Sequence, residues 1–359
     1  MDHHTGRPQT LKLLNQSNVE SIIRSHGPIT KPQIATITKL SLVTVNKTVE
    51  ALLQQESITC LGLTKSSGGR SAKAYGINKE QSYIICLYYE KMHYWSILAN
   101  MAGEIIYEEE FFADSGNINE ATYKAIDKMI LKADNHKISA IGLGLPGVVR
   151  GDILTDIPLI PSWEGYPLVR ILETKYNCSV FIENDINLAA SGLYFNHYKD
   201  DYEHLVLLYL NQGIGSGLII NRDLFKGFSN FAGEIGCLEI PSYENGSSTI
   251  PFEKKISLIS DSLKKDLKDD DLYHLKEELY WSVAYVVGNI ACILNPEIVA
   301  LQCDLLAEDE LELIRKNMKL SKQDCPKLVL VKDFRQHCIN GVLNMCIQKT
   351  RTVLTLLNK

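Results

Sequence analysis

The sequence lacks an apolar run long enough to cross a membrane, and it lacks paired cysteine motifs. Apolar residues make up 45% of its 359 residues, but they fall in short runs, whereas a membrane-spanning helix needs about 20 in succession. The first residues, MDHHTGR, contain no apolar signal region. Nine scattered cysteines without a Cys-x-x-Cys pair favour reduced thiols. We therefore expect a cytoplasmic protein of two or three domains with no membrane partner.

Acidic residues are scarce near the N-terminus. Residues 1–80 contain ten Lys and Arg against five Asp and Glu, a balance of +5. Because the whole chain has a net charge of −6, the remainder has a charge of −11. A basic head on an acidic body is the asymmetry expected when only the head meets nucleic-acid phosphates.

Residues 1–78 have the pattern of a winged helix-turn-helix. Apolar spacing predicts helices at about residues 11–26, 31–39 and 42–54, and Ser41 is placed to cap the third. A short turn joins the last two, so the third is the expected recognition helix. Its predicted outward side chains are Val43, Thr44, Asn46, Lys47 and Thr48.

Two predicted strands at residues 57–61 and 72–75 flank a Gly-Gly-Arg tip, which is typical of a cationic wing that enters a minor groove. An ordinary helical hairpin is the competing interpretation. The candidate DNA-binding residues are Lys31, Ser41, Thr44, Asn46, Lys47, Gly68, Gly69 and Arg70.

Beyond residue 78, strands alternate with helices, which predicts an α/β body. Hairpins are expected at residues 83–99 and 205–220, and a final helix at 340–357. Glycines 213, 215 and 217 allow a tight turn and close backbone approach in the second hairpin. The pattern alone leaves open an actin-like or a Rossmann-type sheet.

Six short motifs resemble those of the ROK family of sugar kinases and repressors. They lie in the family's order at residues 142–147, 161–168, 183–187, 213–217, 232–236 and 295–297. The resemblance implies a winged helix-turn-helix followed by a two-lobed actin-like ATPase body. It divides the chain into a DNA-binding domain (1–78), lobe 1 (79–190 with a C-terminal helix at about 340–359) and lobe 2 (191–339).

The residues that would make the body a kinase are largely missing. Where ROK kinases have a glycine-rich phosphate turn, residues 87–94 contain no glycine, so side chains would keep backbone amides from phosphate. Gln302 and Cys303 replace the family's glycine pair, and Asn211 with Gln212 stands where the kinases usually have Gly-Thr. We expect no nucleotide cofactor and no enzymatic activity.

The family's zinc site is also incomplete. Cys237 stands at its histidine position, and no further cysteine follows until Cys292. One thiol cannot hold a four-coordinate zinc. We expect no metal, and Cys237 is interpreted as a small buried side chain.

The sugar-site half of the family is better represented. Asp185 occupies the family's catalytic position and is expected to be inactive there, while Leu159 replaces an asparagine. The ligand-binding residues that the resemblance implies are Pro146, Gly147, Asn184, Asp185 and Glu234.

These features predict a transcriptional regulator of carbohydrate metabolism genes. Its expected partners are double-stranded operator DNA and a sugar or sugar derivative as effector, and it is expected to form a homodimer or homotetramer. Two alternatives stay open: a ROK sugar kinase with an added DNA-binding domain, and a repressor whose body serves only for dimerisation.

Overall fold

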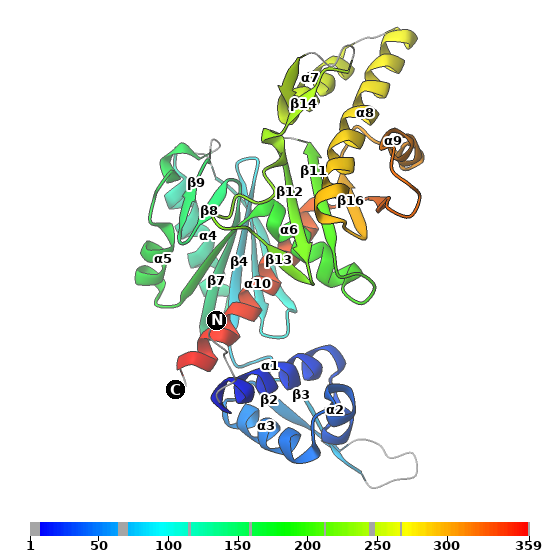
Figure 1. Ribbon diagram of the computed structural model, residues 1–359. Coiled ribbons are helices and arrows are strands. Elements are labelled where there is room, and N and C mark those ends of the chain that lie inside the picture. The colour runs from blue at the N-terminus through cyan, green and yellow to red at the C-terminus, as the bar shows by residue number, and fades with distance from the viewer. Residues whose placement is uncertain are drawn as a thin grey trace.

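The N-terminal head contains three helices and a small antiparallel sheet (Figure 1). The computed structural model describes residues 8–63, 71–113, 116–157, 160–211, 213–243, 248–265 and 268–357. In the head these form α1 (Pro8–His26), β1 (Ile29–Thr30), α2 (Lys31–Thr38), α3 (Leu42–Gln54), β2 (Ile58–Leu63) and β3 (Lys73–Ile77). The strand order is β1-β3-β2. The predicted helix-turn-helix and wing strands are therefore present.

Local capping explains where the helices of the helix-turn-helix begin and end. The side-chain oxygen of Gln33 accepts hydrogen bonds from the backbone nitrogen (2.9 Å) and hydroxyl (2.8 Å) of Thr30. Lys39, with φ 57°, ends α2 in the left-handed region. Ser41 then accepts a hydrogen bond from the backbone nitrogen of Thr44 at 3.1 Å, which starts α3. Side chains from α1, α2 and α3 form the head's core, which includes Val19, Ile23, Ile34, Val45, Val49 and Leu52.

The first body sheet has the order β10-β7-β4-β5-β6. Its strands are β4 (Tyr83–Glu90), β5 (His93–Asn100), β6 (Ile105–Phe112), β7 (Ile138–Leu145) and β10 (Ser179–Asn184). Helices α4 (Ile118–Lys132) and α5 (Leu168–Tyr176) pack on one face. The small hairpin of β8 (Val148–Arg150) and β9 (Ile153–Thr155) follows β7.

The second body sheet has the order β13-β12-β11-β16-β17. Its strands are β11 (Leu205–Asn211), β12 (Gly213–Ile220), β13 (Asp223–Phe225), β16 (Ile298–Gln302) and β17 (Lys327–Leu330). Helices α7 (Phe252–Leu263), α8 (Asp269–Leu294) and α9 (Leu311–Asn317) cover its outer face, and β14 (Glu239–Pro241) pairs with β15 (Thr249–Pro251) beside them.

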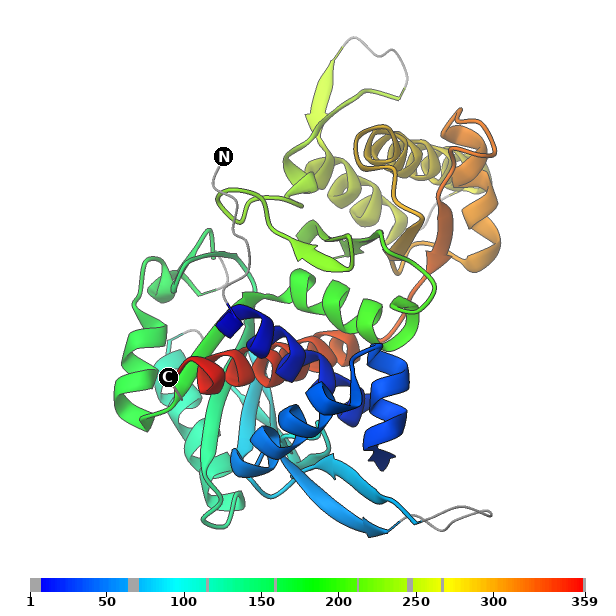
Figure 2. The same cartoon turned by 60° about the horizontal axis from the view of Figure 1, so that its bottom comes forward.

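Two helices lie between the two body sheets. They are α6 (Asp185–Leu193), which continues into a short π-helix (Tyr194–Tyr198), and α10 (Phe334–Leu357). They cross at two glycines: a Cβ on Gly192 would lie 2.0 Å from the carbonyl oxygen of His337, and one on Gly341 would lie 2.0 Å from that of Leu188. Figure 2 shows α6 and α10 side by side between the sheets, with the head in front of α10. One continuous core joins both sheets, α6, α10 and the head.

Within the described ranges, every helix is too short or too polar to cross a lipid bilayer. All nine cysteines are free thiols. Four of them are buried, and Cys60, Cys237 and Cys292 are exposed.

Candidate DNA-binding surface and carboxylate site

The N-terminal half of α3 is the candidate DNA-binding surface. Lys47 is exposed and Asn46 is partly exposed, so both side chains are available from solvent. Thr44 and Ser41 are engaged in the helix cap, with their hydroxyl oxygens 2.8 Å apart. Their predicted DNA contacts would have to share groups that already cap α3.

Lys31 already has partners within the head. Its ammonium nitrogen lies 3.9 Å from a carboxylate oxygen of Glu50 and 5.7 Å from the centre of the Tyr75 ring. Gly68, Gly69 and Arg70, predicted at the wing tip, lie outside the described residues.

Thr48 was expected to face outward, and that expectation is wrong. It is buried because it follows Val45 by three residues and precedes Leu52 by four, which puts it on the core-facing side of the helix. The usable outward face of α3 therefore contains Asn46 and Lys47, together with two exposed apolar side chains, Leu42 and Val43.

The predicted ligand residues come together where β10 meets α6. Asn184 is the last residue of β10 and the N-cap of α6: its side-chain oxygen accepts from the backbone nitrogen of Asn187 (3.0 Å) and its amide nitrogen donates to the carbonyl of Gly147 (2.9 Å). Gly147, after Pro146, has φ 100°, and an added Cβ would lie 3.0 Å from Ile157. We call Gly147, Asn184, Asp185 and Glu234 the carboxylate site.

Glu234 reaches this site from the second body sheet. The preceding Gly233 has φ 101°, and its Cβ would lie 2.1 Å from the carbonyl oxygen of Ser216. The backbone nitrogen of Ser216 donates to the carbonyl of Gly233 at 2.8 Å. This close docking on β12 needs glycine and fixes the turn that carries Glu234.

Both carboxylates of the site resist ionisation. Burial raises the pKa of Asp185 to about 7, and repulsion from Glu90 and Glu234 adds to the rise. Burial also raises the pKa of Glu234, with further repulsion from Asp156 and Glu253. In the described part of the chain, neither carboxylate has an ion pair with a lysine or arginine. The site can accept hydrogen bonds from hydroxyl groups but disfavours an additional negative charge.

Glu183, next to Asn184, binds a lysine from the other sheet. The Lys226 ammonium lies 2.7 Å from a Glu183 carboxylate oxygen, and the Asn230 amide donates to the carbonyl of Val149 at 2.5 Å. Residues 226–230 therefore connect the two halves of the body beside the carboxylate site.

The β4–β5 turn, which the family resemblance matches to a phosphate turn of the kinases, carries side chains at every position. Lys91 and Met92 form the β4–β5 turn with φ 48° and 66°. Arg335 binds Glu90 at 2.8 Å and lies 4.0 Å above the Trp95 ring. The turn thus ends in an ion pair and a stacked guanidinium.

Aromatic side chains lie near Asp185. Tyr88 is buried, and the rings of Tyr209 and Phe334 have centroids 4.3 Å apart. The charge of Asp185 contributes to a raised pKa at both Tyr88 and Tyr209, which places these phenols near that carboxylate.

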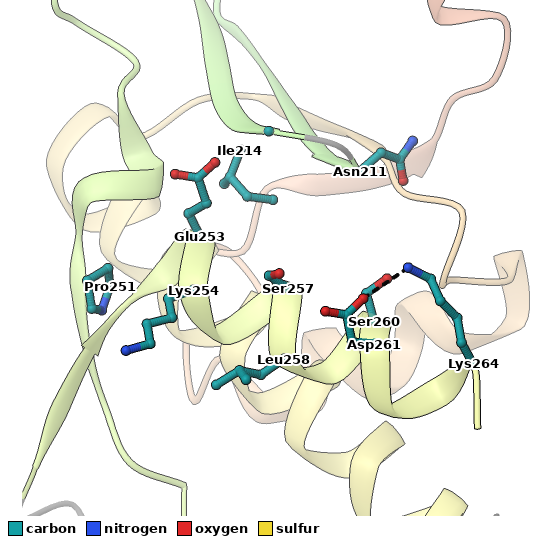
Figure 3. A pocket seen from close by; sticks show the side chains of 11 residues that line it. Asn211, Ile214, Pro251, Glu253, Lys254, Ser257, Leu258, Ser260, Asp261 and Lys264 are labelled. Carbon is teal, nitrogen blue, oxygen red and sulfur yellow. Dashed lines mark hydrogen bonds and ion pairs between the residues drawn. The ribbon is translucent and has the colours of Figure 1, made fainter. Parts of the chain in front are cut away.

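A cavity of about 530 Å³ lies elsewhere, between the β11–β12 turn and α7 (Figure 3). Its wall includes Asn211, Ser257 and the Asp261–Lys264 ion pair at 3.0 Å, but none of the predicted ligand residues. The side-chain oxygen of Asn211 accepts from the backbone nitrogen of Asp304 at 2.8 Å. Sequence reasoning missed this cavity because α7 was not predicted.

Cys237 is exposed, so its interpretation as a buried side chain is wrong. It ends a short 3-10 helix (Ile235–Cys237) that turns its first two residues inward and its third outward. Within the described ranges, no group of three His, Cys, Asp or Glu side chains could hold a metal ion. A single exposed thiol does not fit a structural zinc site.

Part of the body matches a known family model. Residues 91–251 match the ROK family model. The xylose repressor of Caldicellulosiruptor bescii is 30% identical over 239 residues, which cover 64% of this chain and 60% of that protein. The xylose repressor of Bacillus spizizenii is 25% identical over 343 residues, 89% of each chain. The first three curated relatives are matched over about three fifths of their length.

Solved structures support the same fold. A ROK family transcriptional regulator, described as a homologue of the Escherichia coli MLC protein, has a TM-score of 0.76 at 17% identity and covers 97% of this chain and 98% of its own. The ROK hexokinase of Thermus thermophilus has a TM-score of 0.61 at 18% identity, over 75% of this chain and 99% of its own. The match to the regulator includes most of the head, because it covers 97% of this chain.

Proposed function

Because residues 91–251 match the ROK family model, we propose that this protein is a DNA-binding transcriptional repressor of carbohydrate metabolism genes that responds to a sugar and does not phosphorylate it. The observation that carries the proposal is the head: a capped helix-turn-helix with Asn46 and Lys47 on its open face precedes a body whose β4–β5 turn contains no glycine and is flanked by the Arg335–Glu90 ion pair. Residues 1–78 are the proposed DNA-binding domain, and the two body lobes, 79–190 with 340–359 and 191–339, hold the effector.

The proposed effector is an uncharged sugar bound at the carboxylate site. Asp185 and Glu234 supply acceptors for hydroxyl groups, and partial burial strengthens such bonds. A phosphorylated sugar suits the site poorly, because its charge would face two carboxylates without a cationic partner in the described residues.

A path of contacts joins this site to the head through α10. Near its start the Cys338 thiol donates to the backbone carbonyl of Asp185 at 3.4 Å. Toward its other end Ile347 lies 3.5 Å from a Cβ built on Gly103, in the turn between β5 and β6. Arg24 of α1 donates to the carbonyl of Met101 in that same turn. We infer that effector binding moves α10 and thereby changes the position of the head relative to the body.

DNA binding is tested by selecting duplexes from a random library and titrating the best one against random DNA. Asn46→Ala should lose discrimination between the two, because an amide reads base edges. Lys47→Ala should weaken both equally and reduce the salt dependence. Equal affinity of the unmutated protein for both duplexes would refute the proposed function.

Effector binding is tested by thermal unfolding with xylose, glucose and N-acetylglucosamine, each with its phosphorylated form. A neutral sugar should raise the melting temperature, because it binds only the native state. Asp185→Asn should abolish the sugar's effect on operator release while leaving DNA binding intact. No shift with any sugar would favour a body that only dimerises. ATP-dependent phosphorylation lost in Asp185→Asn would establish a kinase.

A further inference from the structure

Two large apolar side chains stand open to solvent at the start of α3. Leu42 is 48% exposed and Val43 is 65% exposed, whereas Val45 and Val49, on the side of the helix away from Val43, are fully buried. Leu42 and Val43 follow the cap residue Ser41 directly, so they occupy the first two positions of the helix. Valine is a weak helix former, and neither residue contributes to the core of the head.

The surroundings of this pair are polar and cationic. Lys39 ends the preceding helix in a left-handed conformation, and Asn46 and Lys47 follow one turn later on the open side. Cationic and amide side chains around an apolar pair match a duplex surface, where phosphates border a groove of mixed polar and apolar groups. A partner protein with a purely apolar patch would not use the flanking lysines.

The first residues of a recognition helix are those that reach base edges in the major groove. There the apolar group available to a side chain is the 5-methyl group of thymine. The hydroxyl groups of Ser41 and Thr44 are hydrogen-bonded to each other in the cap. Of the two side chains between them, that of Val43 is the more exposed.

We propose that Val43, flanked by Leu42, packs against the 5-methyl group of a thymine in each operator half-site. The proposal rests on the proposed function, since it requires α3 to be the recognition helix. This contact would recognise part of the operator sequence without hydrogen bonds, and Asn46 would recognise base edges through hydrogen bonds.

Replacement of single thymines by deoxyuridine in the selected duplex tests this contact, because the exchange removes only the methyl group. One symmetric pair of positions should be sensitive, with about a four-fold loss of affinity for each methyl, the effect of one buried carbon group. Val43→Ser should weaken binding to the thymine duplex by about the same factor and remove the sensitivity to deoxyuridine, while keeping the melting temperature. Leu131→Ser, at a residue 80% exposed on α4 of the body, is the matched control and should keep the unmutated pattern.

The outcomes separate this inference from the proposed function. A preferred duplex whose affinity is unchanged by every deoxyuridine, or whose sensitivity persists in Val43→Ser, would overturn the thymine contact alone. A change of oligomeric state in Val43→Ser, with no deoxyuridine effect in the unmutated protein, would assign the apolar pair to a contact between heads. Failure to prefer any duplex over random DNA would overturn the proposed function itself.

Discussion

The two body sheets start with the same antiparallel hairpin but fill it in opposite ways. The β4–β5 hairpin, which we call the tyrosine hairpin, carries Tyr88, Tyr89 and Tyr94 as buried side chains. The β11–β12 hairpin, the glycine hairpin, carries Gly215 and Gly217, where an added Cβ would lie 2.6 Å from Ile186 and 2.3 Å from Ala190. In one hairpin bulky side chains pack into the core, and in the other the lack of side chains admits helix α6.

The comparison shows that a glycine-rich strand is ambiguous as a functional signal. Glycine allows close approach, but the sequence does not say which group approaches. Here that group is a helix of the same chain, and phosphate recognition is not needed to explain Gly215 or Gly217. Three predictions test the comparison.

Gly217→Ala should have the largest effect. The new methyl would lie 2.3 Å from the Ala190 methyl and 2.9 Å from the Ile186 carbonyl oxygen, so α6 must shift. We expect a loss of about 3 kcal/mol in the free energy of unfolding, measured by urea denaturation. Gly288→Ala on α8 is the matched control: its nearest neighbour lies 3.8 Å away, and the helix should gain up to about 1 kcal/mol. Equal stabilities would show that the close contact with α6 is not needed.

Asp185→Asn should have a smaller, pH-dependent effect at the carboxylate between the hairpins. The folded-state pKa of Asp185 is about 7, above its ordinary value of about 3.9. The protonated Asp185 therefore contributes its full stabilisation below about pH 4, and that contribution is lost as the pH rises through about 7. The asparagine variant keeps the oxygen that accepts from the Ile186 nitrogen at 2.9 Å. It should be more stable at pH 8 by on the order of 2 kcal/mol, after allowance for solvent screening. The measurement is urea denaturation of the unmutated protein and of Asp185→Asn from pH 4 to 8. A constant difference in stability between the two proteins over this range would contradict the prediction.

Met92→Gly should have the smallest effect and sharpen the contrast at the tyrosine hairpin. Met92 is exposed with φ 66°, so glycine relieves a left-handed conformation with little loss of packing. We expect a gain of about 0.5–1 kcal/mol in the free energy of unfolding, measured by urea denaturation. Met92→Ala keeps the unfavourable φ and should show no gain. Neither variant should phosphorylate sugars, because the Arg335–Glu90 pair and the tyrosines remain; ATP-dependent activity in Met92→Gly would show that a missing glycine alone had disabled the turn.

Local signals in the sequence predicted much of the fold. The bounds of α3 follow from Ser41 and the apolar spacing, and the strands of both hairpins were predicted from alternation and apolar runs. Helix α6 was missed because β10 runs into it at Asn184 without a separate turn. Strand β6 was missed because three consecutive glutamates hide its alternation.

The candidate sites were harder to predict, because they depend on non-local packing. Nothing in the residues around Asn184 indicates that both ends of its amide are used, one by Gly147 and one by Asn187. The exposure of Cys237 depends on how a short turn docks on β12. The position of Glu234 beside Asp185 brings together residues from different sheets, a juxtaposition that the sequence suggested only through the family resemblance.

The position of α10 between the two sheets also sets an order for folding during synthesis. The part of the core that lies in the head, with Val19, Val45 and Val49, uses residues that leave the ribosome early. One face of the first body sheet is covered only in part, by α6, until α10 is made: Leu188 packs against Gly144 of β7, whereas Val342 and Cys346 pack against Gly142. A nascent chain therefore has a finished head well before it has a finished body, and binding to DNA in that interval would escape control by the effector.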